Sequence, residues 1–214
     1  MTDNNFNKKI FFLIQQAGML LQMPRSHVRN LGNSFDTIAS HSHHVSVIAY
    51  CIARMENLSH EESMKAMAMA SFHDLAEGRT ADLDFVSKNY TQDDEERAIK
   101  DQFKGIDFGE DLLKLLEEYG ERKTLLAKCV KDADQVAQMF HVWALMWRGN
   151  KIAQQWFESG FVSRVPYFFT ESAKKIVFSM KESNPNEWWW SEFVEESGEA
   201  KTKKHLLGKN YKED

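Results

Sequence analysis

Residues 39–56 read ASHSHHVSVIAYCIARME, and this stretch decides the fold class of the chain. Its large apolar residues recur at the spacing of an α-helix and share one stripe: Val45, Ile48, Ile52 and Met55. His41 lies at the start of the same stripe. The pattern predicts an amphipathic helix whose buried face begins with a histidine.

The flanking sequence extends the helical pattern in both directions. Prolines occur only at positions 24, 166 and 185 of the 214 residues, so residues 25–165 contain none. Because proline interrupts helices, this gap favours an all-α fold. We expect a loop at 24–36, an irregular segment at 79–92, and helices at about 5–23, 39–56, 59–78, 93–104, 109–119, 121–147, 151–159 and 170–181. On the third of these we place Met64, Ala68, Ser71, Phe72 and Leu75 on the core side.

The composition is that of one globular domain. We expect this domain to span residues 1–197 and a polar, lysine-rich tail to follow at 198–214. A formal net charge of −5 gives no basic surface for nucleic acid. The two cysteines, Cys51 and Cys129, form no CxxC motif, which argues against a disulfide framework and a cysteine-based zinc site.

Targeting and membrane segments are not indicated either. No apolar run approaches the roughly 18 residues that are needed to cross a bilayer. The apolar run at residues 10–14 is too short for a signal peptide. We therefore expect a cytoplasmic protein that does not bind membranes.

Four polar residues from separate predicted helices tend toward the interior: His41, His73, Asp74 and Asp134. Asp134 shares a helix face with apolar residues, namely Ala127, Val130, Ala137 and Leu145, and an acidic residue there requires a partner. Two imidazoles and two carboxylates are a natural ligand set for a divalent transition metal. The small Ala70, one turn before the His73-Asp74 pair, leaves room for an ion.

The same residues resemble the H…HD…D signature of the HD-domain metal-dependent phosphohydrolases. Residues 36–42 (DTIASHS) are similar to the family segment E-[SN]-V-A-E-H-S, and residues 73–83 (HDLAEGRTADL) to H-D-x-x-E-x-x-x-G-D-[LI]. Residues 131–134 (KDAD) are similar to K-x-[AL]-D. Pro24-Arg25 matches the arginine that precedes the first histidine in the 5'-deoxynucleotidase-like branch. The resemblance covers about residues 10–190.

The resemblance implies an all-α HD-domain bundle of about seven to nine helices around one metal site. It implies that His41, His73, Asp74 and Asp134 bind one divalent ion, with Co or Mn expected and Mg, Zn, Ni or Fe as alternatives. The expected activity is hydrolysis of phosphomonoesters, with (deoxy)nucleoside 5'-monophosphates as the preferred substrates. A small-molecule nucleotide is then the partner.

The resemblance also assigns roles to residues outside the ligand set. Glu77 is expected to orient or deprotonate the attacking water, and Asp82 to orient water or a sugar hydroxyl. Arg25 is expected to bind the phosphate and to offset its charge during catalysis. Lys88 falls near a basic position of the family that binds substrate.

The chain departs from the family pattern at several positions. Asp36 and Ser40 replace two glutamates, and Ala81 replaces the glycine before Asp82. Ser26 and His27 stand where related enzymes carry an aromatic residue after the arginine, so base or sugar selectivity is expected to differ.

Several alternatives remain open at this point. The substrate is alternatively another phosphate ester or an anhydride, such as a nucleoside polyphosphate, or the chain is a non-catalytic, metal-dependent nucleotide-binding regulator. Asp132 competes with Asp134 as a ligand but projects to the opposite side of its helix. His141 is either a neighbour of the metal site or a core residue. The run Trp188–Trp190 either caps the core or forms a homodimer contact.

Overall fold

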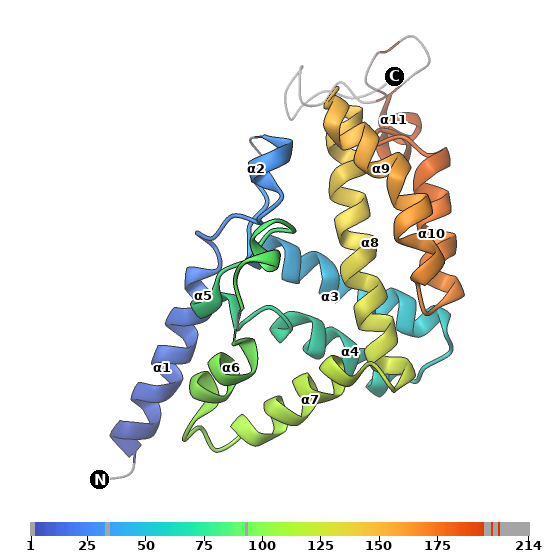
Figure 1. Ribbon diagram of the computed structural model, residues 1–214. Coiled ribbons are helices and arrows are strands. Elements are labelled where there is room, and N and C mark those ends of the chain that lie inside the picture. The colour runs from blue at the N-terminus through green and yellow to red at the C-terminus, as the bar shows by residue number, and fades with distance from the viewer. Residues whose placement is uncertain (1–2, 33–34, 93, 195–197, 199–200, 202–214) are drawn as a thin grey trace, which may run out of the picture.

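The computed structural model describes residues 3–32, 35–92, 94–194, 198 and 201, and these ranges are almost entirely helical (Figure 1). Its longer helices are α1 (Asp3–Met19), α3 (Ile38–Met55), α4 (His60–Phe72), α6 (Glu95–Phe103), α7 (Gly109–Glu121), α8 (Leu125–Trp147), α9 (Lys151–Ser163) and α10 (Glu171–Glu182). The shorter elements are α2 (Val28–Leu31), α5 (Glu77–Thr80), α11 (Glu187–Phe193) and the 3₁₀ turns η1 (Ser87–Asn89) and η2 (Val165–Tyr167). No strand occurs in these ranges, so the predicted all-α fold is confirmed.

Helix α8 is the centre of the molecule. It runs the length of the domain with α9 and α10 beside it, and it also packs against α3 and α4 (Figure 1). Its buried face contains the apolar residues that the sequence placed around Asp134: Ala127, Val130, Ala137 and Leu145. A second, smaller apolar cluster joins α1 to the region of α6, through Leu13, Leu20 and Phe103.

Helix α4 ends earlier than the sequence suggested, and its predicted core side is confirmed only in part: Leu75 is buried and Phe72 packs against the smaller apolar cluster, but Ala68 and Ser71 are exposed. It stops at Phe72, residues 73–76 form a turn, and α5 begins at Glu77, so the expected single helix at 59–78 is wrong. Met64 is 46% exposed, whereas the buried positions are Ser63, Ala66, Met69 and Ala70. Small side chains let α4 approach α3 and α8 closely, so close packing rather than side-chain hydrophobicity selects the buried face.

The predicted loop at 24–36 is closed at its two ends. Pro24 and Thr37 form an isolated antiparallel bridge. The backbone N–H of Arg25 donates to the carbonyl of Asp36 at 3.1 Å, and that of Ile38 donates to Met23 at 3.0 Å. These contacts fix Arg25 beside the start of α3, and α2 lies within the loop.

The C-terminal part of the described chain was not predicted as a helix. Helix α11 contains Trp188, which is 78% exposed, so this residue does not cap the core. Of the predicted tail at 198–214, only Gly198 and Lys201 lie within the described residues. No helix in the described part of the chain is long and apolar enough to span a membrane.

Candidate metal centre

The four predicted ligands come from three elements that pack together. His41 lies on the first turn of α3, His73 and Asp74 lie in the turn after α4, and Asp134 lies on α8. His73 Nε2 is 3.1 Å and His41 Nε2 is 3.6 Å from Asp74 Oδ2. His41 Nε2 is 3.2 Å from Asp134 Oδ1. The structure therefore brings all four residues together.

The turn after α4 explains how two adjacent residues face one point. The backbone N–H of Leu75 donates to Phe72, and that of Glu77 donates to Asp74, which bends the chain at this pair. His73 Nδ1 lies 2.7 Å from the carbonyl oxygen of Ala70, which fixes the imidazole ring and leaves Nε2 to face the carboxylate. The sequence predicted a continuous helix through this pair, whereas the structure has a turn there.

The donor atoms fit a divalent transition metal. Two ligand atoms that are each 2.0–2.2 Å from one ion are about 2.8–3.6 Å apart at octahedral or tetrahedral angles. The measured separations of 3.1, 3.2 and 3.6 Å fall in that range. The Nε2 atoms of His41 and His73 are buried and make no hydrogen bond within the described residues, so each has a lone pair or proton to satisfy.

The carboxylates of this centre are ionised. Burial alone would raise the pKa of Asp74, but His73 and Arg25 outweigh it and lower that pKa. Burial likewise opposes ionisation of Asp134, and Lys131 and His41 hold its pKa well below the ordinary value. Lys131 Nζ donates to Asp134 Oδ2 at 2.6 Å, which leaves Oδ1 facing His41.

Arg25 is buried among three carboxylates. Its Nη1 lies 3.0 Å from Asp74 Oδ2 and 3.7 Å from Glu77 Oε2, and its Nε lies 3.3 Å from Asp82 Oδ2. Burial would lower the pKa of Arg25, but these carboxylates raise it, so the guanidinium is charged. Asp82 is held in turn by the backbone N–H of Ser26, which donates to Oδ2 at 2.9 Å.

Glu77 has a pKa far from that of a free glutamate side chain. It is buried at the start of α5, and its Oε2 makes no hydrogen bond within the described residues. Burial, followed by repulsion from Asp74 and Asp82, raises the pKa of Glu77 to about 9. The structure thus places a carboxyl of raised pKa beside the four predicted ligands and Arg25.

Lys88 is the predicted site residue that the structure does not bring to this centre. It is exposed on η1, and no ion pair in the described ranges joins it to the other site residues. Sequence reasoning missed Tyr119, whose ring lies edge-on to His73 with centroids 5.7 Å apart. Tyr119 lies in the last turn of α7, far from His73 along the chain, so only tertiary packing could reveal the contact.

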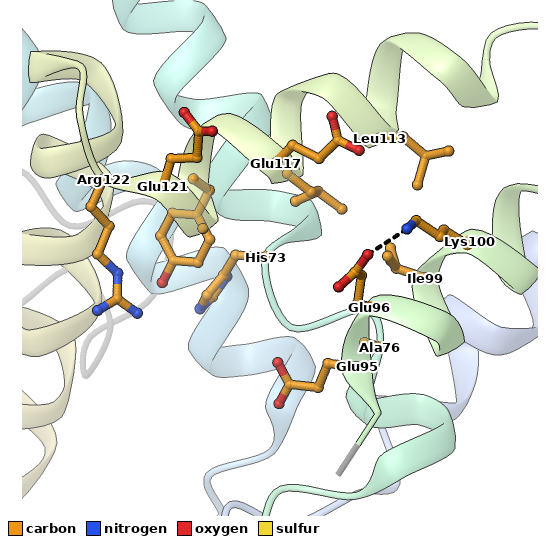
Figure 2. Close-up of a pocket in the computed structure, with 13 residues that line it drawn as sticks. His73, Ala76, Glu95, Glu96, Ile99, Lys100, Leu113, Glu117, Glu121 and Arg122 are labelled. Carbon is orange, nitrogen blue, oxygen red and sulfur yellow. Dashed lines mark hydrogen bonds and ion pairs between the residues drawn. The ribbon is translucent and has the colours of Figure 1, made fainter.

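A cavity of about 570 Å³ meets the centre at His73 (Figure 2). In Figure 2, His73 lies between Arg122 on one side and side chains of α6 and α7, such as Lys100 and Leu113, on the other. The charged lining residues are Glu95, Glu96, Lys100, Glu117, Glu121 and Arg122. The wall is therefore largely acidic away from the ligands.

A second group of histidines and a carboxylate lies near the first. It consists of His27, Asp36 and His141, whose nearest ligand atoms all lie within 4.8 Å of one another. Burial would raise the pKa of Asp36, but His27, His141 and Ser40 lower it. Burial lowers the pKa of His141 to about 4, so this imidazole is neutral.

Comparison with known proteins identifies relatives of this fold. A family model described as HD domain matches residues 17–176. A crystal structure of a genomics target is 27% identical, with a TM-score of 0.64 over 86% of this chain and 99% of that one. A conserved hypothetical protein from Pyrococcus furiosus is 25% identical, with a TM-score of 0.63 over 80% of this chain and 98% of that one.

A protein of Pyrococcus horikoshii OT3 is 22% identical, with a TM-score of 0.64 over 79% of this chain and 97% of that one, and it shares the fold. No curated protein matches the chain. The solved relatives therefore support the fold and leave the substrate to be argued from the site.

Proposed function

The chain belongs to the HD-domain family, whose members are generally metal-dependent phosphohydrolases, and on that basis we propose that it hydrolyses (deoxy)nucleoside 5'-monophosphates to nucleoside and phosphate. The observation that carries the proposal is the convergence of two imidazoles and two carboxylates beside a buried arginine and a carboxyl of raised pKa. These are the groups that phosphomonoester hydrolysis requires: a metal site, a cation for the phosphate and a base.

His41, His73, Asp74 and Asp134 would hold the ion. When bound, a divalent ion lowers the pKa of water and neutralises phosphoryl oxygens. Cobalt and manganese suit this ligand set, as do nickel, iron and zinc. Lys131 keeps Asp134 ionised, and the carbonyl of Ala70 keeps the His73 ring in place.

Arg25 is the group that would bind the phosphate. A guanidinium makes short, charge-assisted bonds to phosphate oxygens, and these bonds strengthen as negative charge develops in the transition state. Asp82 holds Nε of Arg25 at 3.3 Å, so the arginine is oriented before substrate arrives. We assign Asp82 to this positioning and to the orientation of water or a sugar hydroxyl.

Glu77 would take the proton of the attacking water. The repulsion from Asp74 and Asp82 that raises the pKa of Glu77 would be offset by a bound divalent cation, which favours the ionised form that can accept a proton. The unpartnered Oε2 of Glu77 is available for that proton.

The cavity next to His73 favours a monophosphate over a polyphosphate. Four glutamates line it, against one lysine and one arginine, and Lys100 is already paired with Glu96. Additional phosphate groups in such a wall would be repelled, whereas an uncharged nucleoside is tolerated. Lys88, which is exposed on η1, remains a predicted substrate contact only.

The proposal is tested on metal-depleted protein that is reloaded with Co²⁺ or Mn²⁺, and in separate arms with Mg²⁺, Zn²⁺, Ni²⁺ or Fe²⁺. Phosphate release is measured from ribo- and deoxynucleoside 5'-monophosphates, from nucleoside di- and triphosphates, and from unrelated phosphomonoesters. We expect release from the monophosphates. Release from polyphosphates alone would support the anhydride alternative, and nucleotide binding without any release would support the regulator.

Two variants separate the roles of the residues. His73→Ala should lose the ion at the HD ligands and turnover, while His60→Ala, at an exposed histidine of α4, should lose neither. Glu77→Gln should keep its metal and lose about 10²- to 10⁴-fold in kcat. Glu110→Gln, at an exposed position of α7, is its control. Loss of metal from Glu77→Gln would show that Glu77 is a ligand instead.

A further inference from the structure

We propose that His27, Asp36 and His141 bind a second divalent transition-metal ion, separate from the one at the HD ligands. These three residues are called the 27–36–141 cluster below. None of the assigned roles of the family pattern uses His27 or His141, and the cluster shares no residue with the HD ligand set.

The distances within the cluster match those between ligands of one ion. His27 Nε2 and His141 Nδ1 each lie 3.4 Å from the same oxygen, Asp36 Oδ2. Good N–H···O hydrogen bonds are shorter, about 2.7–3.2 Å. Atoms that share an ion are about 2.8–3.6 Å apart when each is 2.0–2.2 Å from it. Both separations are longer than a good hydrogen bond and fall within the range expected for atoms that share an ion.

The second oxygen of Asp36 has a different partner, which orients the carboxylate. Ser40 Oγ donates to Asp36 Oδ1 at 2.9 Å, so Oδ2 is turned toward the two imidazoles. Metal-binding carboxylates are commonly held in this way by an outer hydrogen bond.

Burial adds an independent reason to expect a ligand. His27 is 7% exposed, and its Nε2 makes no hydrogen bond within the described residues although it points at Asp36. Buried polar atoms in native proteins are nearly always satisfied, so an atom without a partner indicates a missing one. An ion at the cluster would satisfy it.

The separation of His141 from Asp134 along α8 argues against a two-metal catalytic centre made of both sites. His141 follows Asp134 by two turns of α8, which is a rise of about 10 Å. The two metal ions of a two-metal catalytic centre are only about 3.5–4 Å apart. The ion would instead tie the loop at 24–36, which carries Arg25, to the start of α3 and to α8.

The ligand types limit the ion. Two imidazoles and one carboxylate favour zinc, cobalt, nickel, iron or manganese over magnesium and calcium, which prefer oxygen ligands. Three protein ligands leave at least one coordination position for water.

The inference is tested by counting ions bound to the full-length, tag-free, metal-depleted protein. Zn²⁺ and Co²⁺ are titrated calorimetrically, and the metal content is measured after gel filtration. We expect two ions per wild-type chain, one for His73→Ala, one for His141→Gln, and none for the double variant. His60→Ala, the exposed control, should bind two.

Removal of a cluster ligand should lower the affinity of the 27–36–141 cluster for its ion by at least about 100-fold. The affinity of the HD ligands for their ion should not change. Asp36→Asn, which keeps the shape and the Ser40 contact, serves as a second variant if His141→Gln does not fold. One ion per wild-type chain, lost completely in His73→Ala, would overturn the proposal. Because ion counting requires no turnover, its outcome is independent of whether the proposed hydrolysis is found.

Discussion

Ala81 has a backbone conformation that L-amino acids rarely adopt. Its φ is +66° and its ψ is 158°, at the end of α5 and directly before Asp82. Glycine stands at this position in the family pattern that the sequence resembles, because it has no Cβ to clash there. The chain therefore stores backbone strain next to a proposed site residue.

Replacing Ala81 with glycine should stabilise the protein. Relief of about 1–3 kcal/mol of strain exceeds the extra flexibility that glycine gives the unfolded chain, about 0.4–1 kcal/mol. We expect a net gain near 1 kcal/mol, measured by urea unfolding. Ala68→Gly is the control, because Ala68 is exposed on helical backbone, and there the same change should cost about 1 kcal/mol. An equal loss at both positions would show that Ala81 is not strained.

The convergence of the four candidate ligands was predictable from the sequence because each of these residues carried its own signal. His41 begins an apolar stripe, His73-Asp74 is an adjacent pair, and Asp134 interrupts an apolar face. The setting of Arg25 was not predictable, because its three carboxylate neighbours belong to segments about 50 residues away along the chain, which only loop closure brings together.

At the scale of elements, Asp132 joins α8 to the start of α10. It accepts hydrogen bonds from the backbone N–H of Phe169 at 3.0 Å, from that of Thr170 at 2.7 Å, and from the Thr170 hydroxyl at 2.7 Å. The sequence placed Asp132 on the side of α8 opposite to Asp134, and these contacts give it a structural partner there. Thr170 in turn caps α10, because its side chain accepts a hydrogen bond from the N–H of Ala173.

Asp132→Ala should destabilise the protein by about 2–4 kcal/mol, because it removes a buried, charged acceptor and leaves its donors unpaired. Metal content should not change. The free energy of unfolding in urea and the bound metal are measured together. Glu182→Ala, at an exposed end of α10, should stay within about 0.5 kcal/mol of the wild type. If the Asp132→Ala variant lost metal, Asp132 would be a ligand of the metal centre instead.

Glu118 links three helices through charge. Lys65 of α4 donates to its carboxylate at 2.7 Å, and Thr124, the N-cap of α8, donates at 2.7 Å. Burial would raise the pKa of Glu118, but these two contacts outweigh it and lower the pKa. A carboxyl whose folded pKa is lowered stabilises the fold above its unfolded pKa, and the contribution disappears as the pH falls through the folded pKa.

Glu118→Gln should therefore cost about 0.5–1 kcal/mol at pH 7, since the partly exposed pair is screened by solvent. The difference from the wild type should shrink as the pH falls below about 4.5. Urea unfolding at pH 7, 5 and 3.5 measures it. A difference that does not vary with pH would mean that the contact acts through packing and not through charge.

The presence of each helix was easier to predict than the residues at which it begins and ends. The all-α fold followed from the proline gap, and most longer helices lie where periodicity placed them. The predicted helix at 59–78 failed at its end and in part of its face, since the turn at His73 and the burial of Ala66 depend on contacts with α3 and α8. Such tertiary contacts override the helical periodicity of the local sequence.

At the scale of the whole molecule, the domain is expected to be complete by residue 197. A chain shortened to residues 1–197 should unfold within about 1 °C of the full chain and bind the same metal, because polar terminal segments add little stability. Thermal unfolding and metal content measure this. Lys201 contacts Ser191 and Phe193 of α11, so a larger loss would show that the tail supports that helix.

The proposed HD ligands are far apart along the chain, although they meet in space. An ion captured before folding would have to close segments of about thirty and about sixty residues, each at an entropic cost. The main apolar core joins α3, α4 and α8 through hydrophobic side chains, so we expect the scaffold to form without an ion. Metal supply in the cell would then decide when the protein becomes active, and not whether the newly made chain survives.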